Sequence, residues 1–270
     1  MLAFSTCWNN SRHIDGEAMI AEILELGFRH IELSHGMTVA KLPGIRKAFQ
    51  NDGFSCAGVH NYFPSPVEVM IDAPDAYEFT SHRPADRQRA MDMTFKTLDI
   101  AAEFGARYLV LHMGSVPLRP AKWTRPLTEM TRDGLGHTAD YARAKLNFVK
   151  KREKIAPLYY QRAISALETI AERAAQAGVK LAIESRSRYE DVPSEREMVR
   201  LQEQGKVRHD VEWPARDHRV PFSGMIDSQS VLRYFPPELP LTWELSPTRE
   251  AADIVAALAK WKTEFPEFAP

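Results

Sequence analysis

The chain has 270 residues, with 35 Lys and Arg against 36 Asp and Glu, a formal net charge of -1 and 44% hydrophobic residues. This composition excludes a disordered chain, which would have fewer apolar residues and a larger net charge. It also argues against a nucleic-acid partner, which would require a strongly basic face. No stretch approaches the ~18 uninterrupted apolar residues of a membrane span, so no membrane partner is expected. The first residues lack both the basic start and the apolar core of a signal peptide. Cys7 and Cys56 are too few for a disulfide scaffold. We therefore expect a cytoplasmic protein whose two thiols are reduced.

Short apolar runs alternate with helical patterns along the chain, and glycines stand at many of the joins. Strands are predicted at Leu2–Ser5, Phe28–Leu33, Phe54–His60, Arg107–His112, Val179–Glu184, Val207–Val211 and Leu241–Leu245. Helices are predicted between Asp15 and Gly27, over Pro43–Asn51, Pro84–Phe104, Ala163–Ala177, Ser194–Gln204 and Ser228–Phe235, and after Ser246. This alternation predicts parallel strands joined by right-handed crossovers.

The first strand distinguishes a closed barrel from an open sheet. It is followed by Cys7-Trp8-Asn9-Asn10 rather than by a glycine-rich phosphate loop, and the dinucleotide-like match Gly134-x-Gly136-x-x-Ala139 follows a polar stretch instead of a strand. We therefore predict a single (β/α) TIM-barrel domain over residues 1–270. Only seven strands are visible where such a barrel has eight. Either one βα unit is missing, or one strand is irregular.

A basic helical elaboration is predicted at residues 115–162. This segment holds eleven Lys or Arg and four Asp or Glu, and Pro157 should end or kink a helix within it. Two interpretations stay open: a solvated helical face, or a lid or subunit contact that attracts an anionic substrate.

Polar side chains end most of the predicted strands. In a barrel these carboxyl ends converge on one mouth, where active sites lie. The residues at or just after the strand ends are Cys7, Trp8, Glu32, His35, His60, His112, Glu184, His209 and Glu244. Because a carboxylate after an apolar strand is costly to bury unless it is paired or binds a cation, we predict a cluster containing Glu184, His209 and Glu244. Such ligands suit Mn²⁺, Zn²⁺ or Mg²⁺.

Each of these residues also has a plainer interpretation. A single strand-end histidine can be a hydrogen-bonded core residue, and Glu184 can pair with Arg186 or Arg188. His60 and His112 can act as metal ligands or as hydrogen-bond partners of substrate hydroxyl groups.

In their order along the chain, these motifs resemble the xylose isomerase-like TIM-barrel superfamily, in particular its sugar phosphate isomerase/epimerase branch. The segments that carry the resemblance are Gly27–Leu33, Val59-His60, Leu111–Ser115, Leu181–Ser185, His209–Val211, Asp217–Gly224 and Trp243–Leu245. The resemblance covers most of the chain. It implies a TIM barrel with metal-binding glutamates on the fifth and eighth strands of the family.

One departure from the family is expected. Glu184 and His209 are only 25 positions apart, which leaves room for a single βα unit. The family's sixth unit, which carries a metal-binding aspartate and a nearby histidine, is therefore predicted to be absent. Its loss would remove one of four metal ligands and open the barrel wall.

The resemblance implies a divalent-metal-dependent isomerase or epimerase of a sugar or sugar phosphate, and a homo-oligomer is possible. Proton transfer beside a carbonyl needs a base, an acid and an electrophile. Glu184 and Glu244 would be the acid/base pair as well as metal ligands, together with His209. The expected substrate-binding residues are His60, His112, Arg219, Trp8 and Phe63.

Two further functions stay open. The barrel could have lost catalysis and serve as a binding or assembly module, which the missing unit favours and the two glutamates disfavour. Phosphodiester cleavage, as in the apurinic-endonuclease branch, would require a three-metal cluster and a basic face for DNA.

Overall fold

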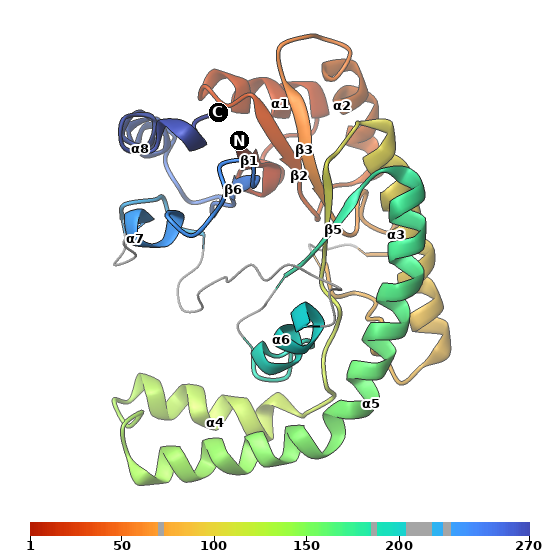
Figure 1. The fold of residues 1–270 in the computed structure, drawn as a ribbon, viewed down its shortest axis with the longest axis vertical. Coiled ribbons are helices and arrows are strands. Elements are labelled where there is room, and N and C mark those ends of the chain that lie inside the picture. The colour runs from red at the N-terminus through yellow and green to blue at the C-terminus, as the bar shows by residue number, and fades with distance from the viewer. Residues whose placement is uncertain (70–72, 185–187, 204–217, 224–227) are drawn as a thin grey trace.

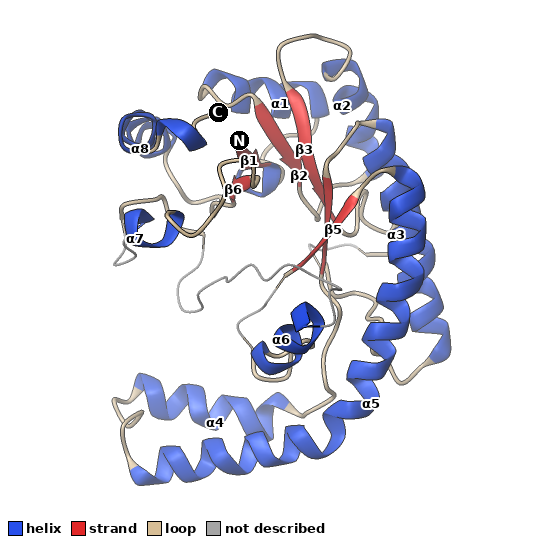
Figure 2. Ribbon diagram, viewed as in Figure 1, coloured by secondary structure: helices blue, strands red, loops and turns tan. Residues whose placement is uncertain are grey.

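The protein is an α/β structure built on one curled, all-parallel sheet. The computed structural model describes residues 1–69, 73–184, 188–203, 218–223 and 228–270 (Figure 1). The six strands of this part of the chain are β1 (Leu2–Ser5), β2 (His30–Leu33), β3 (Ser55–His60), β4 (Tyr108–Leu111), β5 (Lys180–Ile183) and β6 (Leu241–Trp243). They are hydrogen-bonded in the order β5-β4-β3-β2-β1-β6, so the sheet forms an incomplete TIM barrel (Figure 2).

All six strands coincide with predicted ones, to within a few residues at their ends. The first and last strands pair in parallel, with Leu2 opposite Leu241 and Phe4 opposite Trp243. The seventh predicted strand, Val207–Val211, lies outside the described residues.

The described part of the chain contains eight α-helices. They are α1 (Gly16–Glu25), α2 (Leu42–Ala48), α3 (Pro84–Glu103), α4 (Pro120–Arg132), α5 (Ala139–Ala177), α6 (Glu195–Glu203), α7 (Ser228–Leu232) and α8 (Ala251–Glu264). Short 3₁₀ helices lie at η1 (Thr6–Trp8), η2 (Val39–Lys41) and η3 (Pro266–Phe268). Asp15 caps α1 as expected, since its carboxylate accepts a hydrogen bond from the Ala18 amide.

Helix α5 is much longer than the sequence predicted. It begins at Ala139 instead of Ala163 and continues for 39 residues through Pro157. Figure 1 shows that it changes direction near its middle, so the proline bends the helix rather than ending it. The half of α5 before this bend lies beside α4, and the two helices project away from the sheet. The basic segment 115–162 occupies this projection.

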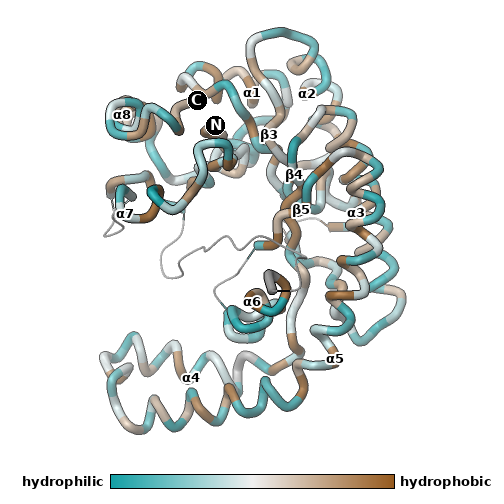
Figure 3. The backbone as a smooth tube through the Cα atoms, in the orientation of Figure 1, coloured by the Kyte–Doolittle hydropathy of each residue, from teal (hydrophilic) through white to brown (hydrophobic). Residues whose placement is uncertain are grey.

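Apolar side chains pack on the strands and tie the sheet to its helices. Phe4 and Phe28 are fully buried with ring centroids 4.6 Å apart, and Trp243 of β6 continues this packing to Trp261 of α8 at 5.4 Å. Figure 3 shows hydrophobic stretches on β4 and β5. Of the helices that the structure describes, none has both the length and the apolar character needed to cross a bilayer.

A side chain that reaches across the barrel interior demonstrates the curl of the sheet. The Tyr108 hydroxyl on β4 donates to Glu32 Oε2 of β2 at 2.9 Å and lies 2.6 Å from Thr242 Oγ1 of β6. Three strands separate β4 from β6 in the sheet, so this contact is possible only because the sheet bends back on itself. Gly58 makes room for the ring, since a Cβ atom there would lie 2.1 Å from Tyr108. Burial raises the pKa of Glu32, which favours the neutral form of the carboxyl group in this enclosed position.

Candidate metal centre

Three side chains converge on one point at the carboxyl ends of β3, β4 and β5. His60 is the last residue of β3, and His112 and Glu184 directly follow β4 and β5. The Nε2 atoms of His60 and His112 lie 3.0 and 2.8 Å from the same oxygen, Oε2 of Glu184. Their potential ligand atoms all lie within 4.8 Å of one another. We call these three residues the histidine group.

The second nitrogen of each imidazole contacts an acceptor. His60 Nδ1 lies 2.9 Å from the carbonyl oxygen of Asn61, and His112 Nδ1 lies 2.9 Å from the carboxylate of Asp75. A carbonyl or a carboxylate can only accept, so each Nδ1 carries a proton, and Nε2 is the nitrogen with which each ring in its neutral form can bind a metal. Histidines that bind a metal typically donate the N–H of their other ring nitrogen to a carboxylate or a backbone carbonyl in this way.

The electrostatics of the histidine group favour a cation over extra protons. Burial lowers the pKa of His60 to about 4, so this ring is neutral near pH 7. Its Nε2 lone pair then faces the Glu184 oxygen, which is also an acceptor, and a cation between them would satisfy both. Burial also raises the pKa of Glu184, but the neighbouring imidazoles of His112 and His60 outweigh it and leave the pKa below its usual value, so the carboxylate is charged. The donor set of two imidazoles and one carboxylate therefore fits a divalent metal.

A second group of potential ligands lies where β1 and β6 pair. Cys7 of η1, His218 and Glu244, which follows β6, have ligand atoms within 4.8 Å of one another. His218 Nδ1 lies 3.0 Å from the carbonyl oxygen of Glu244, and the Cys7 thiol donates to the carbonyl oxygen of Leu245 at 3.3 Å. Burial raises the pKa of Cys7, and the Glu244 carboxylate adds to the shift. We call Cys7, His218 and Glu244 the cysteine group.

The predicted metal ligands are thus distributed over two groups. Glu184 lies with His60 and His112, and Glu244 lies with Cys7 and His218. The third predicted ligand, His209, lies outside the described residues, so a shared ion held by Glu184, His209 and Glu244 stays a prediction.

The comparison with known families identifies the chain. The sequence model of the xylose isomerase-like TIM barrel family matches residues 20–214, most of the chain. The chain belongs to this family. No curated protein sequence matches it significantly.

Solved structures with this barrel fold cover nearly the whole chain. The 3-keto-D-glucoside 4-epimerase of E. coli has a TM-score of 0.62 at 14% identity, over 97% of this chain and 98% of its own. The D-psicose 3-epimerase of Clostridium cellulolyticum, solved with D-tagatose, has a TM-score of 0.62 at 13% identity, over 100% and 99%. A Thermus thermophilus protein soaked with ZnCl2 has a TM-score of 0.57 at 18% identity, over 98% and 97%. At these identities the likeness establishes the fold.

The two aromatic side chains expected to bind substrate are buried in this barrel. Trp8 is 2% exposed, its indole N–H donates to the carbonyl oxygen of Arg249 at 2.9 Å, and the Arg12 guanidinium covers its ring. Phe63 is 1% exposed and belongs to the hydrophobic core. Neither ring offers an exposed face to a sugar. Arg219 is exposed and follows His218 directly.

The structure adds Asp75 and His35 to the residues that were given a role at the site from the sequence. Asp75 lies between β3 and α3, away from any strand end, and no pattern in the sequence marks it. His35 comes just after β2, and its ring packs on His60 with centroids 4.5 Å apart. Its position just after a predicted strand could have marked it as a candidate site residue.

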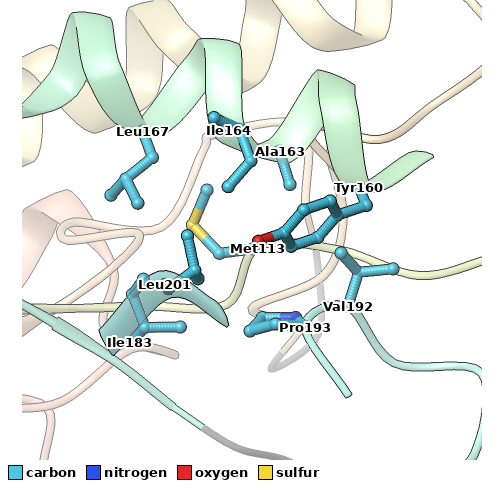
Figure 4. Close-up of a pocket in the computed structure, with 9 residues that line it drawn as sticks. All are labelled: Met113, Tyr160, Ala163, Ile164, Leu167, Ile183, Val192, Pro193 and Leu201. Carbon is cyan, nitrogen blue, oxygen red and sulfur yellow. The ribbon is translucent and has the colours of Figure 1, made fainter. Parts of the chain in front are cut away.

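A small apolar pocket lies between α5, α6 and the carboxyl ends of β4 and β5. Figure 4 shows its lining of Met113, Tyr160, Ala163, Ile164, Leu167, Ile183, Val192, Pro193 and Leu201. These side chains come from α5, α6, β5 and the adjoining segments. Because this lining consists of apolar side chains and one tyrosine, the pocket is a gap in packing and not a site for a sugar.

Proposed function

We propose that the protein is a divalent-metal-dependent isomerase or epimerase of a sugar or sugar phosphate. The observation that carries this proposal is the convergence of His60 and His112 on one oxygen of Glu184 at the carboxyl ends of three adjacent strands. Support also comes from the fold, since solved structures of sugar epimerases share it. The expected reaction moves a proton at the carbon beside the substrate carbonyl.

The histidine group would hold the cation, with Asp75 positioning His112 through its Nδ1–H. When bound, the cation supplies a Lewis acid that polarises the substrate carbonyl. Glu184 and Glu244 would be the two carboxylates that remove and return the proton. They follow β5 and β6, the two outermost strands of the curled sheet in the described part of the chain, which suits approach to a substrate from two sides.

Arg219 would bind oxygen atoms of the substrate, whereas His60 and His112, for which the sequence left open metal binding or contacts to substrate hydroxyl groups, would bind the cation. Arg219 is an exposed cation next to the cysteine group, so it can contact a hydroxyl or a phosphate group. The proposal leaves no substrate-binding role for the buried rings of Trp8 and Phe63.

Exchange of substrate hydrogen with solvent tests the proposal directly. The metal-loaded protein is incubated in D2O with a panel of ketoses and their phosphates, and incorporation of deuterium beside the carbonyl is followed by NMR. Glu184→Gln and Glu244→Gln should each slow the exchange by about 10²–10⁴-fold, because each removes a proton-transfer group. Glu172→Gln, an exposed change on α5, is the control and should have no effect. Full exchange in both active-site variants would end the assignment.

The alternative of a binding or assembly module is favoured by the placement of the two glutamates in separate groups. It makes a different prediction in the same experiment. The protein would bind every tested metal substoichiometrically and would exchange no deuterium with any sugar of the panel.

A further inference from the structure

The cysteine group has the composition of a cation site in its own right. It brings together a thiol, an imidazole and a carboxylate from three segments that are far apart in the sequence, and all three ligand atoms lie within 4.8 Å of one another. Two of the residues extend neighbouring strands: Cys7 lies just beyond β1, and Glu244 lies just beyond β6. The parallel pairing of β1 with β6 therefore sets the distance between them.

The backbone holds His218 in place. Its φ angle is 57°, in the left-handed region that costs energy for a residue with a side chain. Its carbonyl oxygen accepts hydrogen bonds from the Ser246 amide at 3.0 Å and from Arg249 Nε at 3.2 Å. Such a conformation persists only where neighbouring contacts enforce it, and here they point the imidazole at Glu244 and Cys7.

The ring orientation of His218 is that of a metal ligand. Its Nδ1 lies 3.0 Å from the carbonyl oxygen of Glu244, an acceptor, so Nδ1 carries a proton and Nε2 is the nitrogen that can bind a metal. Metal-ligating histidines commonly donate their other N–H to a backbone carbonyl in this way.

Cys7 is also held from two sides. Its thiol donates to the carbonyl oxygen of Leu245, one residue after Glu244. The next residue, Trp8, donates its indole N–H to the carbonyl oxygen of Arg249. The segment after β1 is thus tied to the segment after β6 at two successive positions, which holds Cys7 beside the residues that follow β6.

We propose that Cys7, His218 and Glu244 form a second cation site, separate from the histidine group, that selects Zn²⁺ over Mg²⁺ and Ca²⁺. Sulfur and imidazole ligands suit Zn²⁺, whereas Mg²⁺ and Ca²⁺ prefer oxygen. As the Zn–S bond forms, the Cys7 thiol releases its proton to solvent. Three protein ligands leave a fourth position for water or another oxygen atom, as in catalytic zinc sites. The proposal does not depend on the epimerase activity.

Cobalt serves as the probe, because Co²⁺ bound to a thiolate shows a charge-transfer absorption that oxygen and nitrogen ligands do not produce. The full-length chain is stripped with a chelator and titrated with Co²⁺ and then with Zn²⁺. We expect the thiolate absorption to grow in and Zn²⁺ to displace it, while Mg²⁺ does not. Cys7→Ser should abolish the absorption. Cys56→Ser, a change of the other thiol, whose sulfur contacts the carbonyl oxygen of Gly58, should preserve it.

Two further measurements separate this proposal from the proposed function. Glu184→Gln should preserve the thiolate absorption while removing deuterium exchange, since Glu184 belongs to the histidine group. In the unmodified protein, Zn²⁺ should slow alkylation of Cys7 by about 10-fold or more, as read by peptide mass spectrometry, because a metal-bound thiolate is a weaker nucleophile. No thiolate absorption in the unmodified chain, or absorption that survives Cys7→Ser, would overturn the proposal, as would alkylation unaffected by Zn²⁺.

Discussion

The two ligand groups at the mouth of the barrel differ in how the chain builds them. The histidine group takes its three residues from the ends of β3, β4 and β5, which are neighbours both in the sequence of strands and in the sheet. The cysteine group takes two residues from the segments just after β1 and β6, which pair although they lie at opposite ends of the chain, and its third residue is His218. The first group follows from the periodicity of parallel strands, and the second from the closure of the first strand against the last.

This difference in construction has a chemical counterpart. Both histidines of the first group have an acceptor at Nδ1 and share one carboxylate oxygen, so that group offers nitrogen and oxygen ligands. The second group adds sulfur. If both groups bind cations, they should differ in metal preference and respond to different substitutions.

Removing one imidazole at a time should have the largest effect. His112→Ala should weaken metal binding at the histidine group by more than about 100-fold. Removing a direct metal ligand lowers the affinity more than removing a residue that only hydrogen-bonds to a ligand, which costs about 10–100-fold. His218→Ala should instead remove the cobalt–thiolate absorption and leave the histidine group intact. Chelator competition measures both, with His137→Ala, exposed between α4 and α5, as the control. Equal losses at both groups in either variant would mean that the groups form one centre.

Gly58→Ala should lower the free energy of unfolding by about 1–3 kcal/mol, the usual cost of overpacking. The added Cβ would lie 2.1 Å from the Tyr108 ring, which has to shift away from Glu32 and Thr242. Urea unfolding measures the change. Gly136→Ala, where the nearest atom to a Cβ lies 3.9 Å away, should change stability little. Equal stability of the two variants would show that the ring does not hold the two sides of the barrel together.

Asp75→Asn should weaken metal binding at the histidine group by about 10–100-fold, the usual cost of losing an outer-shell partner. The amide can still accept a hydrogen bond from His112 Nδ1, but it no longer carries the charge that increases the basicity of the ring. Isothermal titration with Zn²⁺ measures the affinity. The cobalt–thiolate absorption should be unchanged, and a loss there as well would contradict the separation of the two groups.

Tyr108→Phe should have the smallest effect, about 1–2 kcal/mol of unfolding free energy. It keeps the ring but removes the hydroxyl that links β4 to β2 and β6. Both metal sites should persist, because neither uses this side chain. A variant as stable as the unmodified protein would mean that ring packing alone maintains the contact between the two sides of the barrel.

Several elements could be predicted from the sequence because local patterns set them. The strand Arg107–His112 is an apolar run after a glycine, and the structure has β4 at Tyr108–Leu111. The sequence predicts a helical elaboration over 115–162 and a separate helix from Ala163, whereas α5 is continuous from Ala139 through Pro157. Its helical state depends on packing against α4 and on the buried side chains of Phe148 and Arg152.

By itself, the sequence determined the alternation of strands and helices and the polar residues at the strand ends. The tertiary structure alone decided which of these residues meet. The curl of the sheet brings His60 and His112 to Glu184, and the pairing of β1 with β6 places Glu244 with Cys7. Asp75 and His218 join these groups through their loops, and burial keeps Trp8 and Phe63 away from solvent. The hydrophobic periodicity that predicts strands and helices depends on residues close in the sequence. The contacts between distant site residues depend instead on the register of the sheet and on the backbone conformation of the loops, which are set by the packing of the whole chain.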